Sequence, residues 1–163
     1  MTTATTLTPR ATPIRAGEPA PDFNLKDQDK NGWTLSAALD KGDVVLCFYP
    51  MDFSPVCTTE QKCATDEMQK FEARGAQVVG ISGDSFYTHK AWADALGLKH
   101  TLLADMHRDV CKAYGLYFID LNIPARGTVI VTRNDAGEPI VKWAQARELG
   151  AAMTVDEVLG AVG

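Results

Sequence analysis

The apolar and polar positions along the chain divide it into short strands and amphipathic helices. Phe23 and Leu25 alternate with polar residues, a polar turn ends at Gly32, and Trp33 and Leu35 resume the alternation. This pattern predicts a short β-hairpin. The runs "DVVLCFY" and "QVVGIS" are continuously apolar and rich in β-branched residues, which predicts strands that are covered on both faces.

Helical periodicity follows each of these two runs. Apolar residues recur at helical spacing over about residues 58–74, and Ser85 and Gly97 bracket the second helical segment as N-cap and stop. A short strand "TLLAD" and a helix "RDVCKAYG" come next, and "GTVIVT" and "PIVKWAQA" predict an antiparallel hairpin around "NDAG". Thr154 with Glu157 predicts a capping box that opens the last helix.

The predicted element order is a β-hairpin, then β-α-β-α-β-α, a second β-hairpin and a final helix. Such an order predicts an α/β protein whose mixed central sheet is flanked by helices. It suits a thioredoxin-like fold with an N-terminal β-hairpin extension, although the pattern alone also allows a flavodoxin-like sheet. A length of 163 residues fits one domain. We expect a flexible tail over residues 1–16 and the domain over residues 17–163.

Charge and composition narrow the possible partners. The net charge is −5 and basic residues are interleaved with acids, which argues against nucleic-acid binding. No apolar run approaches the roughly 18 residues of a membrane-spanning helix. The N-terminus lacks the apolar core of a secretory signal. It is rich in Thr and Arg, as transit peptides are, but Pro13 and the missing apolar face favour a plain tail. We therefore expect a cytoplasmic protein without membrane or nucleic-acid partners.

The four cysteines are the main candidates for chemistry, and three of them lie in "CFYPMDFSPVCTTEQKC". Neither a disulfide scaffold nor a CxxC pair is present. His89, His100 and His107 show no ligand spacing with the cysteines, so we expect no metal and no cofactor.

Cys57 falls where a buried strand has ended and a helix begins. The unpaired N–H groups and positive dipole of a helix N-terminus favour the reactive thiolate. Ser54 can place a hydroxyl near the sulfur, and Pro50 can shield one side of the pocket. An exposed thiol in this setting predicts a nucleophile; the alternative from position alone is a buried structural cysteine.

These residues resemble a known family. "Pro50-x-x-x-Ser54-x-x-Cys57" matches the peroxiredoxin signature P-x-x-x-(T/S)-x-x-C, and "GISGDSFYTHKAW", "LLADMHRDVCKAYGL" and "IPARGTVIV" follow in the family's order. The likeness covers roughly residues 17–162. It is most similar to the bacterioferritin comigratory protein (peroxiredoxin Q) branch, with the one-cysteine-like bacterial branch next.

The resemblance implies a thioredoxin fold and the reduction of hydrogen peroxide or organic hydroperoxides. Cys57 would be the peroxidatic cysteine and become a sulfenic acid, within a pocket shaped by Pro50 and Ser54. Arg126 would face the thiolate, and Glu60 would hold that arginine. Thioredoxin or another small thiol would be the reductant, and we expect a monomer or weak homodimer.

Three thiols are candidates for the resolving role. Cys63 lies six residues after Cys57 on the same predicted helix, where the Cα atoms are about 10 Å apart and a disulfide requires unwinding. The resembled branch spaces its pair as C-x4-C, whereas this chain has C-x5-C. We rank Cys63 first, an external thiol second and Cys111 third. Cys47 suits a packing role. A disulfide reductase and a slow redox sensor on the same fold remain alternatives.

Overall fold

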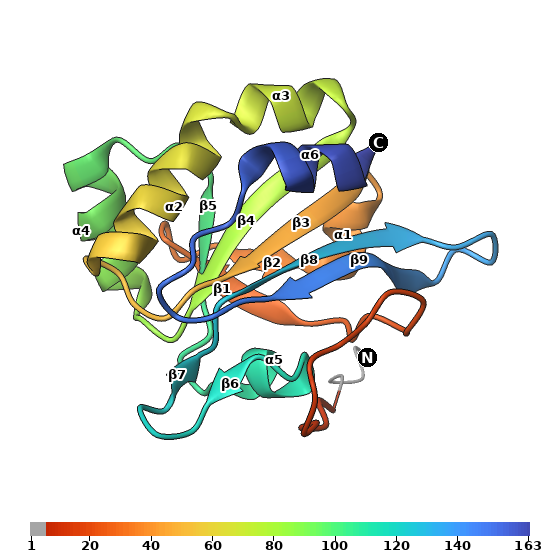
Figure 1. Cartoon of the computed structure of the whole chain (residues 1–163), viewed down its shortest axis with the longest axis horizontal. Coiled ribbons are helices and arrows are strands. Elements are labelled where there is room, and N and C mark those ends of the chain that lie inside the picture. Colours follow the sequence, from red (N-terminus) through yellow and green to blue (C-terminus); the bar gives the residue numbers. More distant parts are fainter. Residues whose placement is uncertain (1–5) are drawn as a thin grey trace.

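The chain forms a mixed central sheet, seen in the middle of Figure 1. The computed structural model describes residues 6–163. The strands of the main sheet are β1 (Asn24–Asp27), β2 (Gly32–Thr34), β3 (Asp43–Phe48), β4 (Ala76–Ser82), β5 (Thr101–Ala104), β8 (Gly127–Arg133) and β9 (Pro139–Ala146). Their order is β2-β1-β5-β4-β3-β8-β9. Strands β3, β4 and β5 are parallel to one another, and all other pairings are antiparallel.

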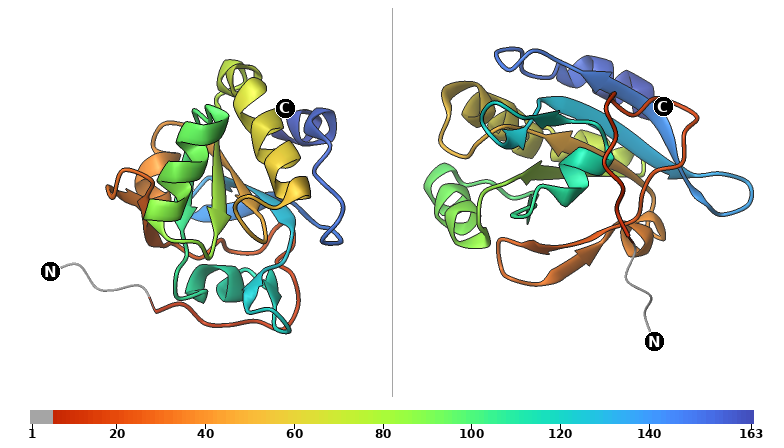
Figure 2. Two further views of the ribbon diagram at one scale, coloured as in Figure 1. Left: turned by 90° about the vertical axis from the view of Figure 1, so that its left-hand side faces the viewer. Right: turned by 90° about the horizontal axis from the view of Figure 1, so that it is seen from below.

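Helices cover both faces of this sheet (Figures 1 and 2). They are α1 (Leu35–Leu39), α2 (Pro55–Asp66), α3 (Met68–Ala73), α4 (Phe86–Leu96), α5 (Asp109–Ala113) and α6 (Val155–Val162). Helices α2, α3, α4 and α6 pack on one face, and α1 and α5 pack on the other. The predicted α/β class with a flanked mixed sheet is confirmed.

Strand β3 explains why the two faces have separate cores. Its side chains alternate between the faces: Val44, Leu46 and Phe48 pack with α1 and α5, while Val45 and Cys47 pack under α3 and α6. All five are fully buried, as the continuous apolar run predicts. The C-terminal end of β3, held between β4 and β8, therefore fixes where the loop into α2 begins.

Two elements differ from the sequence-based prediction. The helix expected over residues 58–74 is two helices, because the backbone at Glu67 leaves the helical region. This break lets Phe71 of α3 pack into the core beneath α6. A two-stranded sheet, β6 (Tyr117–Phe118) with β7 (Ile123–Pro124), was not expected. The predicted N-terminal β-hairpin is confirmed, and its strand β1 also pairs with β5, so the hairpin extends the main sheet.

The predicted helix caps are confirmed in one case and wrong in the other. Ser85 caps α4 by accepting a hydrogen bond from the Thr88 N–H, and Gly97 ends that helix in the left-handed conformation. Thr154 stands at the start of α6 but its side chain makes no capping bond. The partner expected for it, Glu157, instead accepts a hydrogen bond from Gln145 of β9.

Part of the segment expected to be a flexible tail packs against the domain. The N–H groups of Arg10 and Ile14 donate to the carbonyls of Lys112 and Tyr114 at the end of α5, and Ile14 is 2% exposed. The segment over residues 1–16, expected to be a flexible tail, therefore contains residues that belong to the packed domain. Residues 1–5 lie outside the part that the structure describes.

Candidate active site

Cys57 lies in the first turn of α2, which the loop of residues 49–54 joins to the end of β3. Ser54 is the N-cap, Pro55 is the first helical residue, and the Thr58 N–H makes the first bond back to the Ser54 carbonyl. The N–H of Cys57 is thus one of the first-turn donors without an intrahelical partner. Contrary to the expected exposed thiol, Cys57 is fully buried. It packs in a cluster with Tyr49, Trp92 and Leu102, contacts that the sequence pattern did not reveal.

Arg126 reaches this thiol from the loop that precedes β8. Its Nη2 lies 3.1 Å from Cys57 Sγ, and its Nη1 lies 2.9 Å from Glu60 Oε1. Its Nε donates to the Leu149 carbonyl at 2.8 Å. The guanidinium is therefore fixed on three sides at 1% exposure. The structure brings together Cys57, Glu60 and Arg126, as the sequence led us to expect.

Glu60 joins this group to a second arginine that the sequence did not predict. Its Oε2 accepts hydrogen bonds from Arg147 Nη2 at 3.2 Å and from the Met153 N–H at 2.7 Å. Arg147 also donates to Thr128 Oγ1 at 2.9 Å. Because Arg147 lies just beyond β9 and matches no motif, no signal in the sequence distinguishes it from an exposed arginine.

The charges of this buried group do not balance among themselves. Two guanidinium groups face one carboxylate, and all three side chains are at most 8% exposed. A buried excess charge is costly unless it is paired. The guanidinium of Arg126 also lies against the Cys57 sulfur, so the excess positive charge is next to that thiol.

Ser54 and Pro50 are less directly engaged than expected. Ser54 Oγ donates to the Met51 carbonyl at 2.9 Å, and among the described residues its side chain makes no hydrogen bond to Cys57. Pro50 is buried between the end of β3 and the loop. Both residues therefore shape the turn into α2, while the contact to the sulfur comes from Arg126.

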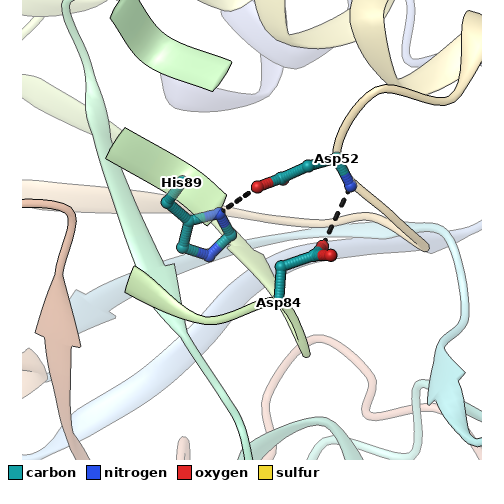
Figure 3. Close-up of side chains that lie close together, drawn as sticks. All are labelled: Asp52, Asp84 and His89. Atoms are coloured by element: carbon teal, nitrogen blue, oxygen red, sulfur yellow. Dashed lines mark hydrogen bonds and ion pairs between the residues drawn. The ribbon is translucent and has the colours of Figure 1, made fainter. Parts of the chain in front are cut away.

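A buried network holds this turn in place, as Figure 3 shows. His89 Nδ1 lies 2.6 Å from Asp52 Oδ2, and the Asp52 N–H donates to Asp84 Oδ2 at 2.9 Å. The Tyr49 hydroxyl donates to the other oxygen of Asp52 at 2.6 Å. Burial raises the pKa of Asp52, and the contact with His89 opposes that rise.

The same three residues are the candidate for a metal site among residues 6–163. The ligand atoms of Asp52, Asp84 and His89 lie within 4.8 Å of one another. However, both oxygens of Asp52 accept hydrogen bonds, and the second nitrogen of His89 lies 3.1 Å from the Leu103 carbonyl. These groups already satisfy one another, so we interpret them as a hydrogen-bonded support of the loop.

The remaining cysteines occupy three different environments. Cys63 is half-buried on α2, six residues after Cys57. Cys47 is on β3, where its thiol donates to the Met153 sulfur and burial raises its pKa to about 12. Cys111 is on α5, on the other face of the sheet from Cys57. Burial and the neighbouring Asp105 raise the pKa of the Cys111 thiol.

A cysteine at a helix start, paired with a buried arginine in this α/β fold, defines a thiol-based redox enzyme. Comparison with known proteins identifies the family within this class. Residues 16–136 match the AhpC/TSA family, and the chain belongs to that family. It is a peroxiredoxin, a thiol-dependent peroxidase, of the Q-like branch that the sequence resembles.

Individual relatives agree with this assignment. The chain is 42% identical over 123 residues to a chloroplastic peroxiredoxin Q of Populus jackii, covering 74% of this chain and 56% of the relative. It is 33% identical over 153 residues to the chloroplastic 2-Cys peroxiredoxin BAS1 of Hordeum vulgare, covering 88% and 71%.

Solved structures confirm the thioredoxin-like fold. The peroxidoxin BcpB of Mycobacterium tuberculosis superimposes with a TM-score of 0.79 at 27% identity, over 91% of this chain and 96% of that one. The reduced 2-Cys peroxiredoxin of Plasmodium vivax gives a TM-score of 0.80 at 32% identity, over 92% and 81%. The flavodoxin-like alternative is thereby set aside. Within residues 6–163, no helix is both long enough and apolar enough to cross a membrane.

Proposed function

We propose that Cys57 is the peroxidatic cysteine and that Arg126 is the cation that activates it. The contact of 3.1 Å between Arg126 Nη2 and Cys57 Sγ carries this proposal. It is supported by the buried charge of the cluster, which a thiolate at Cys57 neutralises. Glu60 is a positioning residue, because it orients Arg126 through one carboxylate oxygen and Arg147 through the other.

The reaction follows from this geometry. The Cys57 thiolate attacks one oxygen of the hydroperoxide, a bond between sulfur and oxygen forms, and the O–O bond breaks. The leaving oxygen departs as hydroxide or alkoxide and takes a proton from water. Cys57 becomes a sulfenic acid. Because the leaving oxygen gains charge as the O–O bond lengthens, donors fixed beforehand at the site, Arg126 Nη2 among them, stabilise the transition state.

Single-turnover kinetics test the assignment of Cys57. We expect Cys57→Ser to lose peroxide consumption, while Cys63→Ser consumes one equivalent of peroxide at the rate of the unmodified protein. Stopped-flow measurement of peroxide loss distinguishes the two. Full turnover by Cys57→Ser would show that the assignment is wrong.

We further propose that Cys63 resolves the sulfenic acid. Its half-buried thiol lies on the helix that carries Cys57, whereas Cys111 lies across the sheet. An external thiol is the alternative. After one equivalent of peroxide, mass spectrometry should find a Cys57–Cys63 linkage; a lone sulfenic acid at Cys57 would instead identify an external resolving thiol.

The physiological setting is also proposed. We infer that thioredoxin or another small thiol returns the enzyme to its reduced form and that hydrogen peroxide and organic hydroperoxides are substrates. We infer a monomer or weak homodimer in the cytoplasm, without nucleic-acid partners. The net charge of −5 and four free cysteines support this setting. Analytical ultracentrifugation of the reduced protein tests the oligomeric state.

A further inference from the structure

A second buried polar cluster lies on α2, outside the group that surrounds Cys57. His100, at 2% exposure, comes just before β5. Its Nδ1 lies 2.6 Å from Thr65 Oγ1, and its Nε2 lies 2.8 Å from Gln61 Oε1. Gln61 and Thr65 are one helical turn apart, so the imidazole bridges two successive turns of α2.

The hydrogen-bond partners determine which nitrogen of the His100 ring carries the proton. Thr65 Oγ1 accepts a hydrogen bond from the Lys99 N–H at 3.0 Å, so its own proton is free to be donated to His100 Nδ1. The ring then carries its proton on Nε2 and donates it to the Gln61 carbonyl oxygen. A neutral imidazole therefore satisfies both contacts, and burial lowers the pKa of His100 to about 4.

The turn after β1 and strand β4 lie against this bridge. In the turn, Gln28 donates to the His100 carbonyl at 3.1 Å and accepts from the Leu102 N–H at 2.9 Å, which holds the backbone on both sides of Thr101. Beneath the Gln61 amide lies Gly80 of β4, where a Cβ atom would come within 2.7 Å of Gln61 Oε1. The amide thus sits in a space that the absence of a side chain at Gly80 creates.

Cys63 lies midway between Gln61 and Thr65 in sequence, within the stretch of α2 that the bridge spans. Six residues of intact helix rise about 9 Å, whereas a disulfide requires Cα atoms about 4.4–6.8 Å apart. The turns between Cys57 and Cys63 must therefore unwind before these two sulfurs can bond. Such unwinding moves Gln61 and strains or breaks its contact with His100.

The folded form of α2 also leaves one buried polar group of Gln61 unpaired. Gln61 Nε2 is buried and has no hydrogen-bond partner among the described residues. An unsatisfied buried donor is destabilising, and water reaches it once the helix unwinds. The Gln61 side chain is therefore held by the contact of its oxygen with His100, whereas its unpaired nitrogen favours unwinding of the helix.

We propose that His100 is a positioning residue that latches the C-terminal half of α2 and thereby sets the rate at which Cys63 reaches oxidised Cys57. The proposal rests on the proposed role of Cys63 as resolving cysteine. In the step that it controls, the Cys63 thiolate attacks the sulfur of the Cys57 sulfenic acid. The Cys63 thiol releases its proton to solvent before the attack. The S–S bond forms as the S–O bond breaks, and the departing hydroxide takes up a proton from solvent to leave as water.

Hydrogen exchange tests the latch itself. His100→Phe keeps a ring of similar size and removes both polar contacts, and His107→Phe is the matched control because His107 is exposed. We expect amides of residues 61–66 to exchange about tenfold faster in His100→Phe, since Gln61 loses its buried partner. Unchanged exchange in this segment would overturn the latch.

A double variant guards against simple misfolding. Replacing both members of a buried polar pair by apolar groups is nearly neutral. The pair Gln61→Leu with His100→Phe should therefore return the exchange of residues 61–66 to that of the unmodified protein. Exchange that is as fast in the double variant as in His100→Phe would contradict a specific contact between these two residues.

Single-turnover kinetics test the effect on catalysis. In His100→Phe we expect the rate of peroxide loss to stay within about twofold, while the Cys57–Cys63 disulfide forms about tenfold faster; the double variant should reverse the gain. Equal rates of disulfide formation in all proteins would overturn the role in resolution. If no such disulfide forms even in the unmodified protein, the assignment of Cys63 fails together with that role, and the exchange measurement still decides whether the latch exists.

Discussion

At the scale of single residues, the proposed activation of Cys57 rests on its contact with Arg126. The planar group of Arg126 donates to a sulfur, a carboxylate and a carbonyl at the same time. A lysine ammonium is a single point of charge on a flexible stem and does not reproduce this geometry. A positive charge at position 126 is therefore insufficient to make all three contacts.

Arg126→Lys should lower the second-order rate constant for hydrogen peroxide by about 10²–10³-fold, the range seen when one preorganised donor is removed. Stopped-flow kinetics measure this rate constant. The control is Arg133→Lys, because Arg133 forms a partly exposed pair with Asp40 far from the site. A rate within threefold of the unmodified protein in Arg126→Lys would contradict the role of the guanidinium.

At the scale of elements, the turn between β3 and α2 decides where Cys57 lies. Asp52 is the centre of its support, with Tyr49 and His89 on its side chain and Asp84 on its backbone N–H. The exposed ring of Phe53 packs on the buried ring of Trp92, with centroids 6.1 Å apart. The start of α2 is thus fixed by residues just beyond β3 and β4 together with residues of α4.

Asp52→Asn should destabilise the protein by roughly 3 kcal/mol, since it leaves buried partners of a charged group unpaired. The displaced turn should also lower the rate of peroxide loss. Urea unfolding and stopped-flow kinetics measure the two effects, and Asp135→Asn in the exposed hairpin turn is the control. Equal loss of stability in both variants would show that the network does not support the turn.

At the scale of the whole molecule, the central sheet separates the cysteines into distinct compartments. Cys111 and Cys57 belong to cores on opposite faces of the sheet. The unwinding of α2 that we propose would therefore bring Cys57 toward Cys63 and not toward Cys111.

Cys111→Ala should form the Cys57–Cys63 disulfide at the rate of the unmodified protein. Its free energy of unfolding should fall by about 1 kcal/mol, because a small buried side chain is shortened. Peptide mapping after one equivalent of peroxide and urea unfolding test both statements. A loss of disulfide formation in this variant would instead assign Cys111 a part in resolution.

The buried His100 links the stability of the whole molecule to pH. Its pKa is about 4 in the folded chain and about 6.5 when unfolded. As the pH falls below about 6.5, the unfolded state binds a proton first, so the free energy of unfolding decreases. The loss is complete near pH 4 and amounts to about 3 kcal/mol; above pH 6.5 this group contributes no dependence.

His100→Phe should lack this part of the acid destabilisation. Urea unfolding at pH 7.5 and pH 4.5 gives the difference for each protein, and the difference should be smaller in His100→Phe than in the unmodified chain. His107→Phe, with an exposed ring, should behave like the unmodified chain. Identical pH dependence in all three proteins would contradict a buried neutral His100.

Local chemistry could be predicted from the sequence because it depends on neighbours in the chain. The apolar run of β3, the helix start at Cys57 and the Ser85 cap each involve residues a few positions apart. The break at Glu67 and the unused Thr154 cap escaped prediction because distant groups override local preference there. Phe71 packs beneath α6, and Glu157 binds β9.

The class of fold and the position of Cys57 at a helix start follow from the order of residues in the chain, and family resemblance adds the pairing with Arg126. The burial of Cys57, the contact of Arg147 with Glu60 and the bridge that His100 makes between two turns of α2 depend on the folded structure. The reason is separation along the chain. Arg147 binds a glutamate 87 residues away, and His100 binds a glutamine 39 residues away, so only the folded sheet brings these groups together.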